Sequence, residues 1–419
     1  MKKESNNYQL LTQAPVSRAI IKMALPSIVI MLITGFYNIA DTFFVGKLST
    51  QATAAVGVVF SVMFFVQAIG FFFGHGSGNY ISRELGAQRH DNAQRMASTG
   101  FFLSFTLGLA VLLIGEACIT PLSLWLGSTP TILPYTEQYL GISLLGTPFF
   151  TSSLTMNNQM RFQGNARLAL WGILSGAIVN VLLDPLFIFV FDMGVAGAAL
   201  ATVIGQFVSF LILLRMTYLG GNIRYSWRNF TPKVALFKEI IAGGTPSLSR
   251  QGLACIAMIL LNTAASVYGD VAIAAMSIVS RCTMMVLAAV IGFGQGFQPF
   301  CGFNYGAQQY QRVKQGFWFS VKVCFIFLLL LSCAGWCFPV EIIDLFRRDA
   351  EVVAIGCEAL KWQLSVLPFL SFTIVSNMLL QTIRKPWRAN LLASARSGLF
   401  FIPLILILPR FFQLQGVEM

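Results

Sequence analysis

Charged residues are scarce in this sequence. Asp, Glu, Lys and Arg make up 11% of the 419 residues, whereas hydrophobic residues make up 56%, and the mean hydropathy is +0.73. Soluble domains carry about 25% charged residues, so this composition excludes an ordinary soluble protein. Acids are scarcer than bases, with 16 Asp and Glu against 28 Lys and Arg.

The side chains that build enzyme and metal centres are also few. The chain has two His and eight Cys residues, and Cys333 and Cys337 form the only close Cys pair. This pair lacks the flanking His or Cys ligands of a zinc site and the spacing of a redox motif. No Ser-His-Asp set and no glycosidase-like pair of acids stands out. We therefore predict that the protein is not an enzyme and needs no cofactor beyond a coupling ion.

One glycine-rich stretch, Gly74-His75-Gly76-Ser77-Gly78, superficially resembles a phosphate-binding loop. It lacks the Gly-Lys-Ser/Thr element that such a loop needs. We predict that its glycines instead allow close packing between helices.

Long apolar segments are what the sequence has in abundance. Each is roughly 20 residues long, which is enough to cross a bilayer. Within lipid they must be helices, because a closed barrel needs short alternating strands. We predict an all-α membrane protein with eleven spans, at about residues 20–45, 54–80, 97–118, 138–160, 168–191, 195–217, 241–267, 271–300, 317–338, 361–382 and 391–412.

The basic residues indicate how these spans are oriented. Most of the 28 Lys and Arg residues fall on one side of the membrane in this scheme, together with the polar N-terminal segment. Lys and Arg accumulate in cytoplasmic loops. We therefore predict a multi-pass protein of the inner, or plasma, membrane with a cytoplasmic N-terminus. The net charge of +12 then reflects topology, and we expect no binding to nucleic acid.

The chain repeats itself once, at an offset of 220 residues. Pro26-Ser27 returns as Pro246-Ser247, and Gly86-Ala87-Gln88 returns as Gly306-Ala307-Gln308. Two homologous membrane halves are typical of transporters, whose substrate site lies between them. We predict an N-lobe at residues 1–220 (helices 1–6), a cytoplasmic linker at 221–234 and a C-lobe at 235–419 (helices 7–11).

The repeat also predicts a missing helix. Gly194-Val195, which opens the sixth helix, matches Gly416-Val417 close to the last residue. The second half would therefore lack its sixth helix, the twelfth of the whole protein. We expect a truncated chain rather than a natively eleven-helical one.

Asp41 and Asp184 lie inside apolar segments, and Glu116 lies near the end of another. Asp41 follows Lys22 by 19 residues and Asp184 follows Arg167 by 17, so at ~1.5 Å per residue both reach nearly the same depth. A carboxylate there costs several kcal/mol unless it is paired, hydrated or protonated, which makes it a functional candidate. The repeat places Leu261 opposite Asp41, so the second half has no equivalent acid.

Polar side chains accompany these acids at helical spacing. Asn180 precedes Asp184 by four residues, and Thr202 precedes Gln206 by four. We expect a group of polar side chains to line a substrate cavity: Thr34, Tyr37, Asn38, Asn157 and Gln206. The alternative is that such side chains hydrogen-bond one another as structural glue.

Pro26 lies one turn into the first span. A proline there removes one backbone hydrogen bond and allows the helix to bend, which would move Asp41. The alternative is a proline that only marks the start of the helix.

Several of these segments resemble the multidrug and toxic compound extrusion (MATE) family. They are Pro26 with Tyr37-Asn-Ile-Ala-Asp41-Thr-Phe-Phe-Val-Gly46, Leu85-Gly86-Ala87, Asn180-Val-Leu-Leu-Asp184-Pro185, and Gly292-Phe-Gly-Gln-Gly-Phe-Gln-Pro299 with Asn304-Tyr-Gly306-Ala307. The resemblance spans essentially the whole chain. It implies two six-helix lobes, from which this chain departs by lacking the last helix, and export of amphipathic compounds in exchange for protons or sodium.

The resemblance also implies where the coupling ion binds. Acids on helices 7 and 10 that one branch uses are missing here, so the chain looks similar to the DinF-like branch. The coupling residues of that branch fall by motif on Asp41, Asn180, Asp184 and Thr202, which would bind H+ or Na+. The helix that holds Pro26 would bend as Asp41 is protonated.

We therefore predict a secondary antiporter, monomeric in the lipid bilayer, that exports lipophilic or cationic small molecules by alternating access. One alternative is a flippase for a lipid-linked or other amphipathic metabolite. That function would need several basic residues in the central cavity, where only Arg250 and Arg281 qualify. A membrane-embedded enzyme is a remote alternative. The sequence distinguishes neither the substrate nor H+ from Na+.

Overall fold

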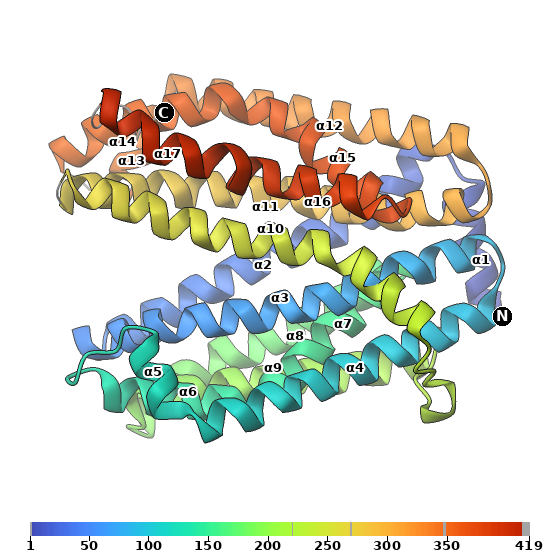
Figure 1. The fold of residues 1–419 in the computed structure, drawn as a ribbon, viewed down its shortest axis with the longest axis horizontal. Coiled ribbons are helices and arrows are strands. Elements are labelled where there is room, and N and C mark those ends of the chain that lie inside the picture. Colours follow the sequence, from blue (N-terminus) through green and yellow to red (C-terminus); the bar gives the residue numbers. More distant parts are fainter. Residues whose placement is uncertain (1, 220, 269, 347–348, 413–419) are drawn as a thin grey trace.

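The computed structural model describes residues 2–219, 221–268, 270–346 and 349–412. Within these ranges, the side chains of residues 2–6, 37–42, 50, 219, 262, 266, 270, 273, 396–397, 410 and 412 lie outside the description. The regular structure of the described ranges is entirely helical. The predicted all-α fold is therefore confirmed, and Figure 1 shows the long helices running roughly side by side.

The first half of the chain forms helices α1 to α9. Their bounds are α1 (Lys2–Thr12), α2 (Val16–Gly46), α3 (Thr50–Gly86), α4 (His90–Ala117), α5 (Ile119–Trp125), α6 (Leu133–Leu145), α7 (Thr147–Phe162), α8 (Ala166–Pro185) with the π-helical turn η1 (Leu186–Val190), and α9 (Gly194–Leu219).

The second half follows a linker with one short 3-10 turn, η2 (Trp227–Asn229). It comprises α10 (Val234–Ser266), α11 (Asp270–Gly306), α12 (Tyr310–Cys337), α13 (Pro339–Asp344), α14 (Ala350–Val366), the 3-10 turn η3 (Leu367–Phe369), α15 (Leu370–Thr382), α16 (Pro386–Ser394), the π-helical segment η4 (Ala395–Phe400) and α17 (Phe401–Phe412).

The sequence repeat is also a structural repeat. Helices α3 and α11 begin and end 220 residues apart, and so do α4 and α12. The turns that follow α3 and α11 both place a glutamine, Gln88 or Gln308, at a φ of 60°. A left-handed residue other than glycine is uncommon, so its recurrence at equivalent positions shows that the halves share fine backbone detail.

Ten of the eleven predicted spans have a matching apolar helical segment, although 361–382 is interrupted by η3 and 391–412 by η4. Among the described residues, nine segments are long and apolar enough to cross a membrane, and the bent pair α16–α17 supplies a tenth. The prediction of one continuous helix at 138–160 is wrong, because the chain there divides into α6 and α7. Pro148, at the start of α7, has no N–H to continue the ladder. The Thr147 hydroxyl instead donates to the carbonyl oxygen of Leu144 at 2.8 Å.

The outer surface of the bundle is apolar. Large hydrophobic side chains on several long helices are mostly exposed, among them Leu113, Leu182 and Leu330 at 62–67%. Soluble monomers rarely expose such extensive apolar surface, whereas lipid would cover it. The protein is therefore a multi-pass membrane protein.

The halves meet through two equivalent helix pairs. Helix α2 packs against α11, and its repeat counterpart α10 packs against α3. In Figure 1, α4 to α9 lie together below this junction and α12 to α17 lie above it. Each half thus contributes its first two long helices to the contact.

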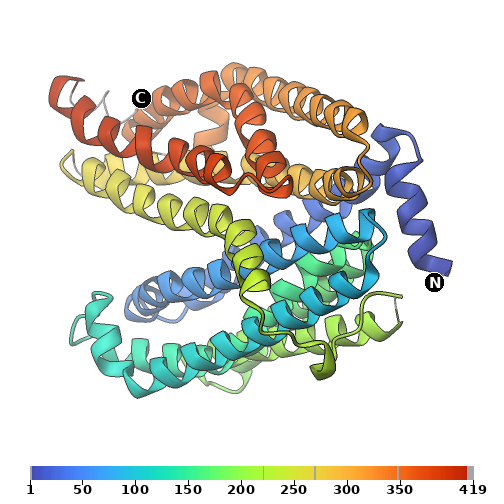
Figure 2. The same ribbon diagram turned by 45° about the vertical axis from the view of Figure 1, so that its right-hand side comes forward.

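The closest contacts between the halves lie toward the end of the bundle that carries α1, called here the α1 end. Backbone touches backbone where Gly76 meets Ile240, Gly296 meets Ala24 and Gly86 meets Phe303, and no Cβ would fit at these glycines. Toward the opposite end the ribbons of α3 and α10 diverge (Figure 2). The prediction that the glycines around His75 serve close packing is confirmed.

The segments that lead into each half make hydrogen bonds to the other half. Asn304 Nδ2 and Arg312 Nη2 of the second half donate to the carbonyl oxygens of Leu11 in α1 and of Ala14 just after it, at 2.9 and 2.8 Å. Helix α1 also bonds to the first half, where its Asn7 Nδ2 donates to the Gln163 carbonyl oxygen at 3.1 Å. The linker precedes the second half but bonds to α4 of the first. Its Ser226 and Thr231 amides donate to the hydroxyls of Ser98 and Thr99 at 3.2 and 3.1 Å.

Candidate functional site

A buried carboxyl group lies inside the first half, on α8. Asp184 has no exposed surface, and Asn180, one turn earlier on the same helix, is 1% exposed. The amide nitrogen of Asn180 lies 3.4 Å from Asp184 Oδ1 and 3.2 Å from Thr202 Oγ1 on α9. The structure therefore brings together three of the four predicted coupling residues.

Small residues bring α8 and α9 close enough for this contact. A Cβ on Gly205 of α9 would lie 2.8 Å from the carbonyl oxygen of Gly176 and 3.0 Å from the Asn180 Cβ. Because Thr202 lies almost one turn before Gly205, this close approach sets its hydroxyl beside Asn180. Helix α8 then ends at Pro185, directly after the acid, and η1 follows.

The other predicted coupling residue, Asp41, lies on α2, which packs against α8. Its side chain lies outside the described residues, as do those of the predicted cavity residues Tyr37 and Asn38. Their roles stay predictions. Thr34, half-buried on the same helix, donates to the Ile30 carbonyl oxygen at 2.8 Å.

The remaining two predicted cavity residues lie in different surroundings. Gln206 is 8% exposed on α9, and its Oε1 faces Gly146 at the break between α6 and α7. Asn157 is 4% exposed and donates to the Ala169 carbonyl oxygen at 2.8 Å, so it ties α7 to α8. This hydrogen bond of Asn157 fits the alternative in which polar side chains hold helices together. The predicted place of Asn157 in the substrate cavity stays a prediction.

The buried oxygens at Asp184 fit a small cation better than a transition metal. Asn180 Oδ1 is buried without a hydrogen-bond partner among the described residues. The same residues hold no group of three or more His, Cys, Asp or Glu side chains. Carboxylate, amide and hydroxyl oxygens are hard ligands of the kind that alkali and alkaline-earth cations prefer. A proton would instead bind the carboxylate directly.

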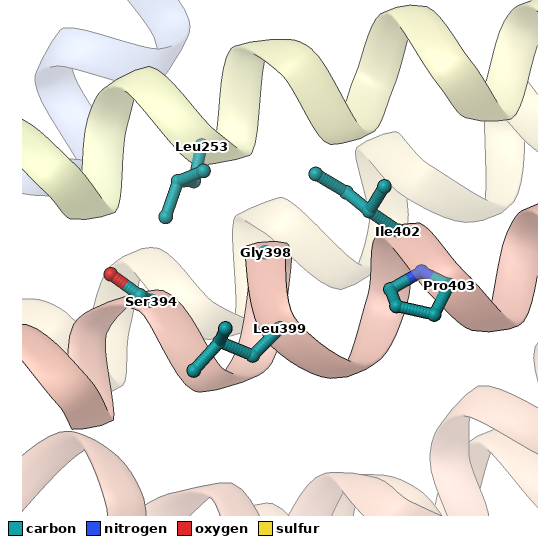
Figure 3. Close-up of a pocket in the computed structure, with 6 residues that line it drawn as sticks. All are labelled: Leu253, Ser394, Gly398, Leu399, Ile402 and Pro403. Atoms are coloured by element: carbon teal, nitrogen blue, oxygen red, sulfur yellow. The ribbon is translucent and has the colours of Figure 1, made fainter.

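The second half has an apolar pocket beside the counterpart of the helix that carries Asp184. A pocket of about 450 Å3 lies between α10 and the α16–α17 segment, which are the counterparts of α2 and α8 (Figure 3). Among the described side chains, its lining is Leu253, Ser394, Gly398, Leu399, Ile402 and Pro403, of which Ser394 is the polar one. This described lining holds no acid, unlike the Asp184 site on α8.

Sequence reasoning missed a polar cluster between the halves. Arg161, which the span prediction places in a loop, is 1% exposed near the end of α7 and donates to Gln295 of α11. Arg83 of α3, also placed in a loop by that prediction, forms a 2.9 Å ion pair with Glu239 of α10. The sequence did offer one sign of this cluster. The predicted span 138–160, which ends just before Arg161, contains the polar run Asn157-Asn158-Gln159.

Comparison with known proteins now identifies the family. The MatE family model matches residues 26–186 and again residues 246–407, once in each half and over more than half of the chain. The chain belongs to the MatE family. The resemblance seen in the sequence is confirmed, while the DinF-like branch stays a prediction.

Individual relatives agree with this assignment. MatE proteins are transporters, so the chain is not an enzyme. The "Multidrug export protein MepA" of Staphylococcus haemolyticus (strain JCSC1435) is 26% identical over 413 residues, which cover 97% of this chain and 90% of the relative.

Solved structures share the fold. An outward-facing multidrug resistance MATE family transporter of the MOP superfamily aligns with a TM-score of 0.92 at 24% identity, over 98% of this chain and 93% of that one. A MATE in the bent conformation also aligns with a TM-score of 0.92 at 24% identity, over 98% and 92%.

Proposed function

We propose that this MatE protein is a multidrug exporter that exchanges lipophilic or cationic compounds for H+ or Na+. The observation that carries the proposal is the Asp184 carboxyl group, which is fully buried in a membrane-spanning helix and contacts Asn180, which in turn contacts Thr202. A buried ionisable group in a membrane helix is typical of an ion pathway. The similarity to a staphylococcal multidrug export protein supports export as the direction.

Cation binding would change the charge of the site. A bare carboxylate inside the membrane is costly, and a proton or sodium ion would remove that cost. Asn180 and Thr202 supply neutral oxygens that a sodium ion could share with Asp184. Asp41, on the neighbouring helix α2, would complete the site, and Pro26 would let α2 bend when its charge changes.

Alternating access would use the two helix pairs that join the halves. The close contacts gather at the α1 end, which is the cytoplasmic end if the N-terminus lies in the cytoplasm. In that orientation the structure corresponds to a state closed toward the cytoplasm. Rocking of one half against the other about a central site is the common mechanism of such transporters.

Drug export and ion flux in proteoliposomes test this proposal. Asp184→Asn keeps the size of the side chain but cannot bind a proton, and we expect it to abolish export driven by either a pH or a sodium gradient. Scanning the two gradients separately on the wild type identifies the coupling ion.

Asp192 supplies the matched control, because it lies exposed in the loop after η1. Asp192→Asn makes the same chemical change and should export normally. Wild-type export with unchanged ion dependence in Asp184→Asn would refute the coupling role.

A further inference from the structure

A fully buried cation lies between the two halves. Arg161 donates through Nη1 to Gln295 Oε1 on α11 and through Nη2 to Asn158 Oδ1, one turn earlier on α7. Its side chain is 1% exposed. The guanidinium group therefore crosses from the first half into the second.

Arg161 lies within the closest contact of the halves. Its partner Gln295 directly precedes Gly296, which touches the backbone of Ala24. The repeat counterpart of Gln295 is His75, which directly precedes Gly76, where α3 touches Ile240 of α10. The side chain of Arg161 is thus part of the close packing between the two halves at the α1 end, called here the seal.

No negative charge compensates this cation in the contacts described. Both partners of the guanidinium are neutral amide oxygens, and its Nε has no hydrogen-bond partner among the described residues. Burying a charge without a counter-charge is strongly unfavourable, so its presence calls for a reason other than stability.

The repeat supplies an uncharged comparison. The counterpart of Arg161 is Gln381 on α15, which is 2% exposed. Its Nε2 donates to the Gly243 carbonyl oxygen at 2.6 Å and to Ser247 Oγ at 2.9 Å. A neutral amide therefore meets the packing and hydrogen-bonding needs of the equivalent position, and the positive charge of Arg161 is an addition to them.

We propose that Arg161 is an electrostatic barrier that keeps cations from crossing the closed α1 end. A cation that entered the seal would meet a fixed positive charge in a medium where repulsion is much stronger than in water. Fixed arginine charges exclude cations and protons from water-conducting pores in the same way. The inference rests on the proposed cation-coupled export, because a leak through the closed end would dissipate the driving gradient.

Passive cation leak in substrate-free proteoliposomes tests the barrier. Arg161→Gln removes the charge and installs the amide found at position 381. Gln295→Glu leaves Arg161 in place but gives it a carboxylate partner. Under a membrane potential, both variants should raise H+ and Na+ leak by roughly tenfold or more, the factor expected for a unit charge about 10 Å from the path. Arg161→Lys keeps the charge and should leak within about twofold of the wild type.

Controls separate charge from a loosened seal. Thr382→Val removes the 2.8 Å hydrogen bond from Thr382 Oγ1 to Asn79 Oδ1 between the halves without changing any charge, and should not raise cation leak. Chloride and glycerol flux should also stay at the wild-type level in Arg161→Gln. The barrier is disproved if both neutralising variants leak like the wild type, if Arg161→Lys leaks as they do, or if chloride and glycerol rise in step with the cations.

Asp184→Asn distinguishes this inference from the proposed function. It should abolish coupled export while its passive leak stays at the wild-type level, because the barrier is intact. If Asp184→Asn still exports, the coupling role fails, and the leak comparison still decides the role of Arg161.

Discussion

Asn157 and Asn377 occupy equivalent positions in the two halves and make the same hydrogen bond. The Asn157 amide donates to the Ala169 carbonyl oxygen at 2.8 Å, and the Asn377 amide donates to that of Ala389 at 2.6 Å. Each bond ties two consecutive helices across a short turn. The shared geometry makes the two residues comparable in experiment.

Asn157→Ala and Asn377→Ala should each lower the free energy of unfolding by about 0.5–1.5 kcal/mol, since each removes one buried hydrogen bond while the helical carbonyl keeps its backbone donor. Denaturant unfolding of the purified protein in detergent measures this. Gln51→Ala, at an exposed amide on α3, should change stability by less than about 0.5 kcal/mol. Asn377 Oδ1 also accepts from Arg250 Nη1 at 3.2 Å, so Asn377→Ala should lose the more stability of the two. Equal losses would show that the contact with Arg250 contributes little.

The carboxylate of Glu239 pairs with two arginines in different surroundings. Arg83 lies 2.9 Å away with 13% of its side chain exposed, whereas the side chain of Arg384 is 67% exposed. Breaking a buried pair typically costs about 3 kcal/mol or more, and an exposed pair contributes less than about 1 kcal/mol. Arg83→Asn should therefore lower the unfolding free energy far more than Arg384→Asn.

The same denaturant measurement in detergent checks this pair of variants. Asparagine is the matched replacement, because Arg384 has a φ of 66°, which asparagine tolerates. Equal losses of unfolding free energy in the two variants would mean that burial does not strengthen the stabilisation by the Arg83–Glu239 ion pair.

The glycines at the α1 end let the two halves approach to backbone contact, so a side chain added there should disturb the closed state. Gly296→Ala would place a methyl group against the Ala24 backbone. We expect this variant to lose most export and to show faster hydrogen–deuterium exchange along the facing segments of α2 and α11, because the closed state is destabilised. Gly35→Ala is the control, since a Cβ there meets nothing within 4 Å. Normal export by Gly296→Ala would show that the contact can relax.

Arg312 should hold α1 against the second half. It donates to Asn304 Oδ1 at 2.9 Å and to the Ala14 carbonyl oxygen at 2.8 Å. Arg312→Ala should raise hydrogen–deuterium exchange in residues 7–14 by about tenfold, the factor for losing about 1.4 kcal/mol. Lys314→Ala, an exposed change on the same helix, should leave that exchange unaltered. Slow exchange in Arg312→Ala would show that α1 is held mainly by its other contacts, among them the hydrogen bonds of Asn7 to Gln163 and Asn165.

Much of the fold could be predicted from the sequence because lipid restricts the choices. Apolar runs of the right length have to be helices, and the 220-residue offset by itself pairs α3 with α11. The break between α6 and α7 was not predicted, since it depends on Pro148 and on the hydroxyl that replaces its missing donor. A hydropathy profile does not register the replacement of one hydrogen-bond donor by another.

The candidate site was predicted in part for similar reasons. Asn180 could be linked to Asp184 because i, i+4 spacing fixes one face of a helix and an acid inside a span is rare. Thr202 joined them only through the family resemblance. Arg161 was overlooked because its burial arises from the meeting of two halves that are far apart in sequence. Its partner Gln295 lies 134 residues away along the chain. No periodicity within one helix can reveal such a contact.

The exchange of leading segments between the halves bears on how such a duplicated protein can evolve. Helix α1 and the turn after it bond to α11 and α12, and the linker bonds to α4, so each leading segment makes part of its hydrogen bonds to the other half. A half separated from its partner would lose these bonds. Once two copies are fused, this arrangement favours keeping both.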